Sequence, residues 1–374
     1  MKTGVRASAG PSAPPRWPHN AAPPALVNVR RGNVIESRHR GAIVQVGADL
    51  AVERALGDSE TVVTLRSAVK PFTLIALVES GAADSFHLTH AELAVMASSH
   101  SGEDMHVRTL QAVFRRATLS QTLLACGDMA PLDALTAARL ARDGEAPGPV
   151  RHMCSGFHAA SIMLSRHAGW SLDDYWRPDH PSQVAARDAV ARAFGVRPTA
   201  LVTVGDDCGL ATYAFPLLEV ARAYALLADP AGVAAGEARR SVVPALTRIR
   251  DAMLAAPEMV GGSRDRLDTA LTVVGARRMI AKSGAEGLRG VALLPEARGP
   301  RSTAAGLAIA IEDGGDQRGT HVATVEAVRQ LGALDERALR QLAAYAHPVT
   351  RDPQGDVVGE VLPGFELAPI SELT

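Results

Sequence analysis

The stretch LRSAVKPFTL (residues 65–74) places Ser67 three residues before Lys70, at the start of the apolar run PFTLIALVES. Apolar residues on a wide face predict a helix over residues 67–80, with Pro71 tolerated in its first turn. Residues three apart lie on the same face of a helix, so the hydroxyl of Ser67 and the amine of Lys70 are expected to meet. The stretch therefore predicts a serine nucleophile with a lysine as its base.

Lysine is rare in this chain, which makes its positions informative. Of the 39 Lys and Arg residues, only Lys2, Lys70 and Lys282 are lysine. Arginine stays charged, whereas a buried lysine can lose its proton and act as a base. Lys2 falls in a predicted tail, and Lys282 lies in Ala-Lys-Ser-Gly on a predicted strand. Lys282 is therefore interpreted as a second cation beside Lys70. The Ser-x-x-Lys spacing alone is a weak signal, because chance supplies it for about one lysine in twenty.

The composition indicates a globular protein with one large domain or two intimate ones, and a single domain is expected over residues 25–374. The 374 residues are 47% hydrophobic with a net charge of -1, and no apolar run reaches the length of a membrane span. Nucleic-acid and membrane partners are not expected. Residues 1–24 lack a continuous apolar segment, which predicts a disordered extension and a cytoplasmic protein. Three cysteines are too few for a disulfide framework and suit a reducing compartment.

The order of predicted elements indicates an α+β fold. Alternating residues around Gly32 and Gly41 predict two or three antiparallel strands near the N-terminus, and strands return late in the chain. The segments 25–66 and 270–374 are expected to share one antiparallel sheet flanked by helices, beside a mostly helical lobe over 67–269. Helices are predicted at 89–98, 105–117, 131–142, 155–167, 182–194, 216–229, 236–255, 319–332 and 335–345, and strands at 200–204 (short and buried), 278–294 and 306–315.

Two polar stretches are interpreted as loops. Residues 100–103, His-Ser-Gly-Glu, are expected at the mouth of a cleft between the sheet and the lobe. The stretch IEDGGD (311–316) lacks the spacing of a calcium loop and is interpreted as a hairpin turn.

Several motifs together resemble a known family. They are RGNVIESRHRG (31–41), ASSHSGE (97–103), CSGFH (154–158), GDDCG (205–209) and AKSGAEG (281–287). Over residues 25 to about 365 the chain is similar to the type II asparaginases typified by the inducible rhizobial L-asparaginase. The resemblance implies a fold similar to serine β-lactamases and glutaminases, hydrolysis of L-asparagine to aspartate and ammonia, and a homodimer. It implies catalytic roles for Ser67, Lys70, Ser99 and Lys282, and substrate-binding roles for Arg66, His100 and Asp206.

The resemblance also implies a metal held by two cysteines and a lysine. Cys154 and Cys208 match the cysteines, but Phe157 stands at the position of the lysine, and a phenyl ring cannot bind a metal. His158 is four residues after Cys154 on a predicted helix, so Cys154, Cys208 and His158 form a candidate zinc set. The alternative is that two buried cysteines and a histidine remain after the metal site was lost.

Three functional hypotheses follow. The first is hydrolysis of L-asparagine through an acyl-enzyme on Ser67. The second keeps the Ser-Lys chemistry with glutamine, a β-lactam or another small amide as the substrate. The third is a catalytically impaired relative that binds an amino acid or a protein partner, because Phe157 replaces the family lysine.

Overall fold

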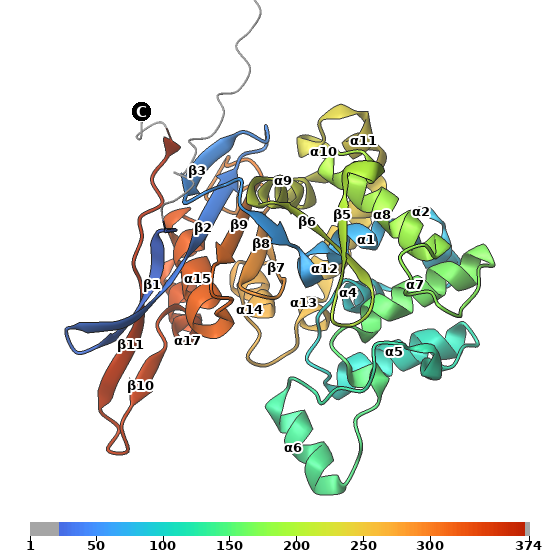
Figure 1. Cartoon of the computed structure of the whole chain (residues 1–374), viewed down its shortest axis with the longest axis horizontal. Coiled ribbons are helices and arrows are strands. Elements are labelled where there is room, and N and C mark those ends of the chain that lie inside the picture. The colour runs from blue at the N-terminus through green and yellow to red at the C-terminus, as the bar shows by residue number, and fades with distance from the viewer. Residues whose placement is uncertain (1–21, 371–374) are drawn as a thin grey trace, which may run out of the picture.

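The computed structural model describes residues 22–370, in which a large antiparallel sheet lies beside a helical lobe (Figure 1). The predicted extension over residues 1–24 falls, apart from 22–24, outside the described residues. Within them the eight strands of the sheet follow the order β10-β11-β1-β2-β9-β8-β7, with β3 also paired to β2. The strands are β1 (Ala25–Arg31), β2 (Val34–Val46), β3 (Val52–Leu56), β7 (Met279–Ser283), β8 (Leu288–Leu293), β9 (Ala305–Ile311), β10 (Val349–Arg351) and β11 (Val357–Pro363).

This strand order confirms the predicted α+β arrangement, because strands from both ends of the chain pair with each other. β1 is antiparallel to β11, and β2 is antiparallel to β9. Gly32 makes the turn between β1 and β2 with a φ of 54°. Gly41 instead lies inside β2, where an added Cβ would stand 2.0 Å from the carbonyl oxygen of Ala310. The segment therefore forms two strands, and Gly41 marks a close approach to β9.

Helices cover both faces of the sheet. On one face α9 (Leu217–Ala228) packs against a core that includes Val44, and on the other α15 (His321–Gln330) packs against a core that includes Ile43. The alternation of neighbouring residues between the two cores follows from the two-residue period of a strand. The remaining helices of this part are α14 (Leu267–Val274), α16 (Glu336–Gln341) and α17 (Ala343–Ala346).

The helical lobe is confirmed, with finer divisions than the sequence predicts. The predicted helix over 67–80 is a 3₁₀ turn followed by two short helices, and the one over 236–255 is split in two. The lobe contains η1 (Arg66–Val69), α1 (Lys70–Thr73), α2 (Ile75–Glu79), α3 (Ala82–Ser85), α4 (His90–Met96), α5 (Asp104–Arg116), η2 (Gln121–Leu123), α6 (Ala134–Asp143), η3 (Pro149–Arg151), α7 (Ser155–Ala168), α8 (Pro181–Phe194), η4 (Pro198–Ala200), α10 (Pro230–Val233), α11 (Gly236–Ser241), α12 (Val243–Ala255) and α13 (Pro257–Val260).

A second sheet of three strands lies within the lobe, in the order β4 (Val62–Thr64), β6 (Ala211–Pro216) and β5 (Val202–Gly205). The sequence predicts β5 as a buried strand, which is wrong: Val202 is 58% exposed, because β5 is an edge of this sheet. The buried central strand β6 was not predicted. The stretch 311–316 is also no hairpin turn, since β9 leads into the π-helical turn η5 (Asp316–Thr320) and then α15.

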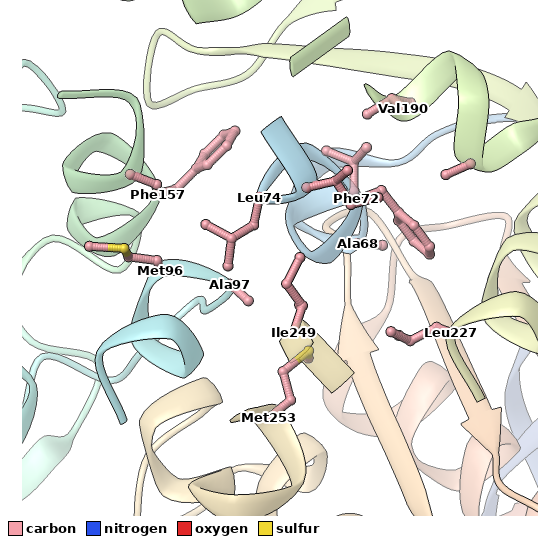
Figure 2. Packing of buried hydrophobic residues seen from close by; sticks show 14 of the residues in the cluster. Ala68, Phe72, Leu74, Met96, Ala97, Phe157, Val190, Leu227, Ile249 and Met253 are labelled. Atoms are coloured by element: carbon pink, nitrogen blue, oxygen red, sulfur yellow. The ribbon is translucent and has the colours of Figure 1, made fainter. Parts of the chain in front are cut away.

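The segment that carries Ser67 and Lys70 is anchored by aromatic packing. Figure 2 shows apolar side chains from the surrounding helices gathered around α1. The Phe72 ring makes edge-to-face contacts with Phe194 and Tyr224, at centroid distances of 5.4 and 5.6 Å. The Tyr224 hydroxyl of α9 donates a hydrogen bond to the carbonyl of Ala68. The short helix is thereby fixed against the helix that covers the main sheet. In the part of the chain that the structure describes, we find no helix with the length and apolar character needed to span a membrane.

Candidate active site

Ser67 faces a cavity of about 480 Å³ between the lobe and the main sheet. The turn that carries it begins at Arg66, whose φ of 48° places a non-glycine residue in the left-handed region. Such backbone conformations cost free energy and are retained where the surrounding structure holds them. Side chains from the lobe and the sheet share the cavity wall, including Ser99, Met129, Leu132, His152, Met153, Cys154, Asp206, Asp207, Cys208, Arg266, Asp268, Ser283, Arg289, Gln317 and His321.

Lys70 is fully buried behind this wall and donates three hydrogen bonds. Its Nζ lies 2.7 Å from the carbonyl oxygen of Ser98, 3.2 Å from Ser99 Oγ and 3.2 Å from Cys154 Sγ. Three donated hydrogen bonds are the full capacity of an ammonium group. Among the described residues, no hydrogen bond joins Lys70 Nζ to the Ser67 hydroxyl. The expected contact is therefore replaced by one with Ser99.

Lys282 is also fully buried, and it reaches the same hydroxyl from the sheet. Its Nζ donates to Ser99 Oγ at 2.9 Å and to the carbonyl oxygen of Ser283 at 2.7 Å. Burial lowers the pKa of Lys282 to about 7, and the positive charge of Lys70 acts in the same direction. Ser99 thus joins the two lysines, and one of them loses its proton near neutral pH.

The two residues predicted to hold substrate, Arg66 and Asp206, are paired with each other. Arg66 Nε donates to Asp206 Oδ1 at 2.8 Å, and its Nη2 donates to Asp207. Both Arg66 and Asp206 line the cavity beside Ser67. Their charges are mutually neutralised, and the guanidinium also holds the strained turn in place.

His100 lies away from the cavity wall in the described structure. It is fully buried, with Nε2 2.8 Å from Ser155 Oγ, and its Nδ1 accepts a hydrogen bond from the Gly102 N–H. Burial holds the pKa of His100 well below its usual range, so the ring is neutral. Residues 100–103 form the expected loop between α4 and α5, but its expected position at the cleft mouth is wrong, because Ser101 and Glu103 are buried as well. The substrate-binding role of His100 stays a prediction that its position does not support.

The candidate zinc residues do not assemble into a set of three ligands. The thiol of Cys208 hydrogen-bonds to Cys154, which holds the pKa of Cys154 well below its usual range. His158 turns its Nδ1 to the hydroxyl of Tyr175 at 2.6 Å, and its buried Nε2 has no hydrogen-bond partner in the described structure. Over residues 22–370 no group of three His, Cys, Asp or Glu side chains is placed to hold a metal ion. The residues present do not fit a three-ligand zinc site, and zinc binding stays a prediction.

Phe157 takes a different role from a metal ligand. Its ring is buried against the core, and the Nζ of Lys70 lies 5.5 Å from the ring centroid. A cation at this distance from an aromatic face is stabilised by the ring quadrupole. Phe157 therefore favours a positive charge on Lys70.

Sequence reasoning missed the polar cluster under the sheet side of the cavity. Asp268, Arg289 and Ser283 line the wall together, and Arg266 Nη2 donates to the carbonyl of Ser99 at 2.8 Å. Burial lowers the pKa of His321, another wall residue, to about 3. The available signal was the run of residues after 264, where Asp and Arg alternate before an apolar helix, but spacing alone does not distinguish it from a solvated turn.

Comparisons with known proteins gave one matching family model and solved structures of low similarity. No curated protein sequence matches the chain. Similar solved structures include Mglu in its glutamate form, with 16% identity over 79% of this chain and 62% of that chain and a TM-score of 0.35. Another is a probable glutaminase from Bacillus subtilis complexed with 6-diazo-5-oxo-L-norleucine, with 11% identity over 79% of this chain and 85% of that chain and a TM-score of 0.38. The chain thus spans less than two thirds of the length of Mglu. The family model described as L-asparaginase II matches residues 27–363, which is most of the sequence, and the chain therefore belongs to the L-asparaginase II family.

Proposed function

We propose that this protein hydrolyses L-asparagine to L-aspartate and ammonia through an acyl-enzyme on Ser67. Membership of the L-asparaginase II family supports an amidohydrolase. The observation that carries the proposal is that Ser67 and Ser99 line one cavity and that Ser99 Oγ accepts hydrogen bonds from two buried lysines. A serine hydroxyl needs such a base to become a nucleophile at neutral pH.

The first half of the reaction forms an ester. The Ser67 Oγ attacks the side-chain amide carbon of asparagine, and its proton passes through the Ser99 hydroxyl to the neutral amine of Lys282. The oxyanion that forms is stabilised by the adjacent cation of Lys70 and by backbone N–H groups at the start of η1. The tetrahedral intermediate collapses, the amide nitrogen takes the proton back, and ammonia leaves.

The second half repeats these steps with water. Neutral Lys282 removes a proton from the water that attacks the ester carbon, and the proton returns to Ser67 Oγ as aspartate leaves. This assignment makes Lys282 the base and Lys70 the fixed cation, which exchanges the roles expected from the helix spacing. The exchange rests on the hydrogen bonds: Lys70 uses all three of its donors, whereas Lys282 has a pKa of about 7.

Trapping the acyl-enzyme tests the proposal. Wild-type protein is mixed with L-asparagine, quenched in acid within the first turnovers, digested and analysed by mass spectrometry. We expect an aspartyl adduct on the peptide that contains Ser67 and none in Ser67→Ala. An adduct on the Ser99 peptide, or none on any serine during turnover, would refute the assignment of the nucleophile.

A substrate panel separates the other hypotheses. L-asparagine, L-glutamine and a chromogenic β-lactam are compared at equal concentration. Turnover of glutamine or the β-lactam without turnover of asparagine would favour a different small amide. Binding of asparagine, measured by calorimetry, without ammonia release would identify an impaired relative.

The homodimer implied by the resemblance is proposed here as well, and sedimentation equilibrium tests it.

A further inference from the structure

A buried carboxylate lies beneath the catalytic wall and has no role in the steps above. Asp268, in the first turn of α14, is 3% exposed and lines the cavity beside Ser283 and Arg289. Its Oδ2 accepts hydrogen bonds from the Ser283 N–H at 2.8 Å and from the Ser283 hydroxyl at 2.7 Å. Its Oδ1 accepts one from Arg289 Nε at 3.1 Å. The carboxylate therefore connects α14 to the ends of β7 and β8.

These contacts lead directly to Lys282. Ser283, whose N–H and hydroxyl bind Asp268, receives the Lys282 Nζ on its carbonyl oxygen. Lys282 in turn donates to Ser99 Oγ. A continuous chain of hydrogen bonds thus runs from Arg289 through Asp268 and Ser283 to the lysine and the bridging serine.

A purely structural role for this cluster would be costly. Burying a carboxylate and a guanidinium removes both from water, and well-packed apolar side chains of the same volume are often at least as stabilising. Arg289 is 2% exposed and its Nη1 reaches only as far as Thr324 Oγ1 of α15, at 3.5 Å. The charges of Asp268 and Arg289 are therefore better explained by their effect on the protonation of Lys282 than by a contribution to stability.

Four charged groups, from different elements packed around Lys282, shift its pKa. Asp268 of α14 raises the pKa of Lys282 and is the largest interaction that opposes the effect of burial. Lys70 and Arg266 lower the pKa, and Cys154 raises it. Without a carboxylate at position 268, only the thiolate of Cys154 would oppose the effect of burial and of the two cations on the pKa of Lys282.

We propose that Asp268 is a positioning residue for the hydrolytic reaction. It fixes the end of β7 through Ser283, and its negative charge sets how readily Lys282 exchanges a proton with Ser99. Its kinetic consequence rests on the proposed function. Its effect on Lys282 does not, and it can be measured without any substrate.

The scarcity of lysine makes the direct measurement practical. Protein labelled with [ε-¹³C]lysine carries label at only Lys2, Lys70 and Lys282. The Lys282 signal is identified as the one missing from Lys282→Arg. Its chemical shift is followed from pH 5 to 10 in wild type, Asp268→Asn and the charge-conserving control Asp268→Glu.

We expect the Lys282 signal of Asp268→Asn to titrate roughly 1 pH unit lower than in the wild type, because an opposite charge has been removed. Asp268→Glu should titrate closer to the wild type. Equal titration of Lys282 in wild type and Asp268→Asn would overturn the proposal, whether or not the protein hydrolyses asparagine.

Should Asp268→Asn fail to fold, Arg289→Gln provides the opposite change. It releases the Asp268 carboxylate from its ion pair, so the Lys282 signal is expected at higher pH than in the wild type. An unchanged or lower value would contradict the proposal.

Kinetics then distinguish positioning from general destabilisation. In Asp268→Asn the acidic limb of kcat/KM should move to lower pH with the Lys282 titration, and kcat should fall more than KM changes. A fall in the amount of folded protein with an unchanged pH profile would show a structural role only. If neither wild type nor variant releases ammonia while the Lys282 titration still shifts, the proposed substrate fails and the effect of Asp268 stands.

Discussion

Two lysines share one hydroxyl at this site, and their surroundings differ. Lys70 donates three hydrogen bonds and stands over the Phe157 ring, whereas Lys282 donates two and has a pKa of about 7. The proposed role of Lys282 as a base requires lysine rather than arginine at position 282, because only lysine can lose its proton.

The pH dependence of activity follows from Lys282. Since the proposed mechanism makes the neutral amine of Lys282 the base, kcat/KM is expected to rise with pH through about 7 as Lys282 loses its proton. Lys282→Arg keeps the positive charge at all pH values and should lower kcat by roughly 10²–10⁴-fold. Lys70→Arg should lose less, because it preserves the cation. A larger loss in Lys70→Arg, with the acidic limb intact in Lys282→Arg, would show that Lys70 is the base.

We expect the residue at position 157 to decide whether Cys154 and Cys208 can hold zinc. Replacing Phe157 with lysine would supply the nitrogen donor that the resemblance implies for the metal. We expect Phe157→Lys to bind about one zinc per chain, and the wild type to release ammonia equally well after chelation. The metal content after dialysis is measured by elemental analysis, with Phe157→Leu as a control that adds no donor. Stoichiometric zinc in the wild type would contradict the geometric conclusion.

At this scale the sequence identifies candidate reactive residues, whose roles stay predictions, and it predicts their contacts poorly. Lysine scarcity and spacing single out Ser67, Lys70 and Lys282 without any structure. The partner of Lys70 was wrong, since its side chain turns toward Ser99 on a segment far away in the sequence. Asp268 was missed because its importance comes from burial and from the neighbouring strands, which periodicity does not report.

At the scale of elements, the contact between α9 and the main sheet holds the site together. An added Cβ on Gly290 would stand 2.2 Å from the ring of Tyr224, and one on Gly306 would stand 1.9 Å from the carbonyl oxygen of Ala221. Both glycines lie on buried strands and allow the helix to approach. The same helix fixes Ala68 through Tyr224.

Gly306→Ala tests this packing. Because the obstacle is backbone rather than a flexible side chain, α9 must shift, and we expect a loss of about 1–3 kcal/mol in the free energy of unfolding. Gly205→Ala is the matched control, since nothing lies within 4 Å of its added Cβ at the end of β5. Urea denaturation followed by circular dichroism measures both. Equal stability of the two variants would show that α9 adapts without cost.

Long elements were predicted well from periodicity and caps. The Thr89 capping box opens α4 as expected, with Thr89 accepting from the Glu92 N–H and the Glu92 carboxylate accepting from the Thr89 N–H. Short elements were predicted less well. The break after Thr73 divides one predicted helix, and β6 was absent from the prediction. β6 pairs with the neighbouring β5 and, on its other side, with β4 from a distant part of the chain, a long-range pairing that the local pattern does not indicate.

At the scale of the whole molecule, buried titratable groups make stability depend on pH. Burial lowers the pKa of His158 and of His321 to about 3, below the value near 6.5 of an unfolded histidine. Each neutral histidine favours the folded state above pH 6.5 and loses this contribution as the pH falls toward 3. The pKa of Asp133 is lowered chiefly by its hydrogen bonds with Arg264, so its contribution is complete above about pH 4 and is lost in stronger acid.

The thermal midpoint is therefore expected to fall between pH 7 and pH 5, and further below pH 4. His321→Gln removes one of the titrating groups and should reduce the dependence between pH 7 and pH 5. Differential scanning calorimetry at constant ionic strength measures the midpoints. A midpoint that stays constant from pH 7 to pH 5 would show that these histidines are not buried as neutral rings.

The most direct test of the whole account is ammonia release from L-asparagine by purified wild type beside Ser67→Ala, at pH 8 where Lys282 is neutral. We predict steady release by the wild type and a loss of nearly all activity in Ser67→Ala, with unchanged folding by circular dichroism. Release by Ser67→Ala at the wild-type rate, or none by the folded wild type, would contradict the assignment of Ser67 as the nucleophile of an asparagine amidohydrolase.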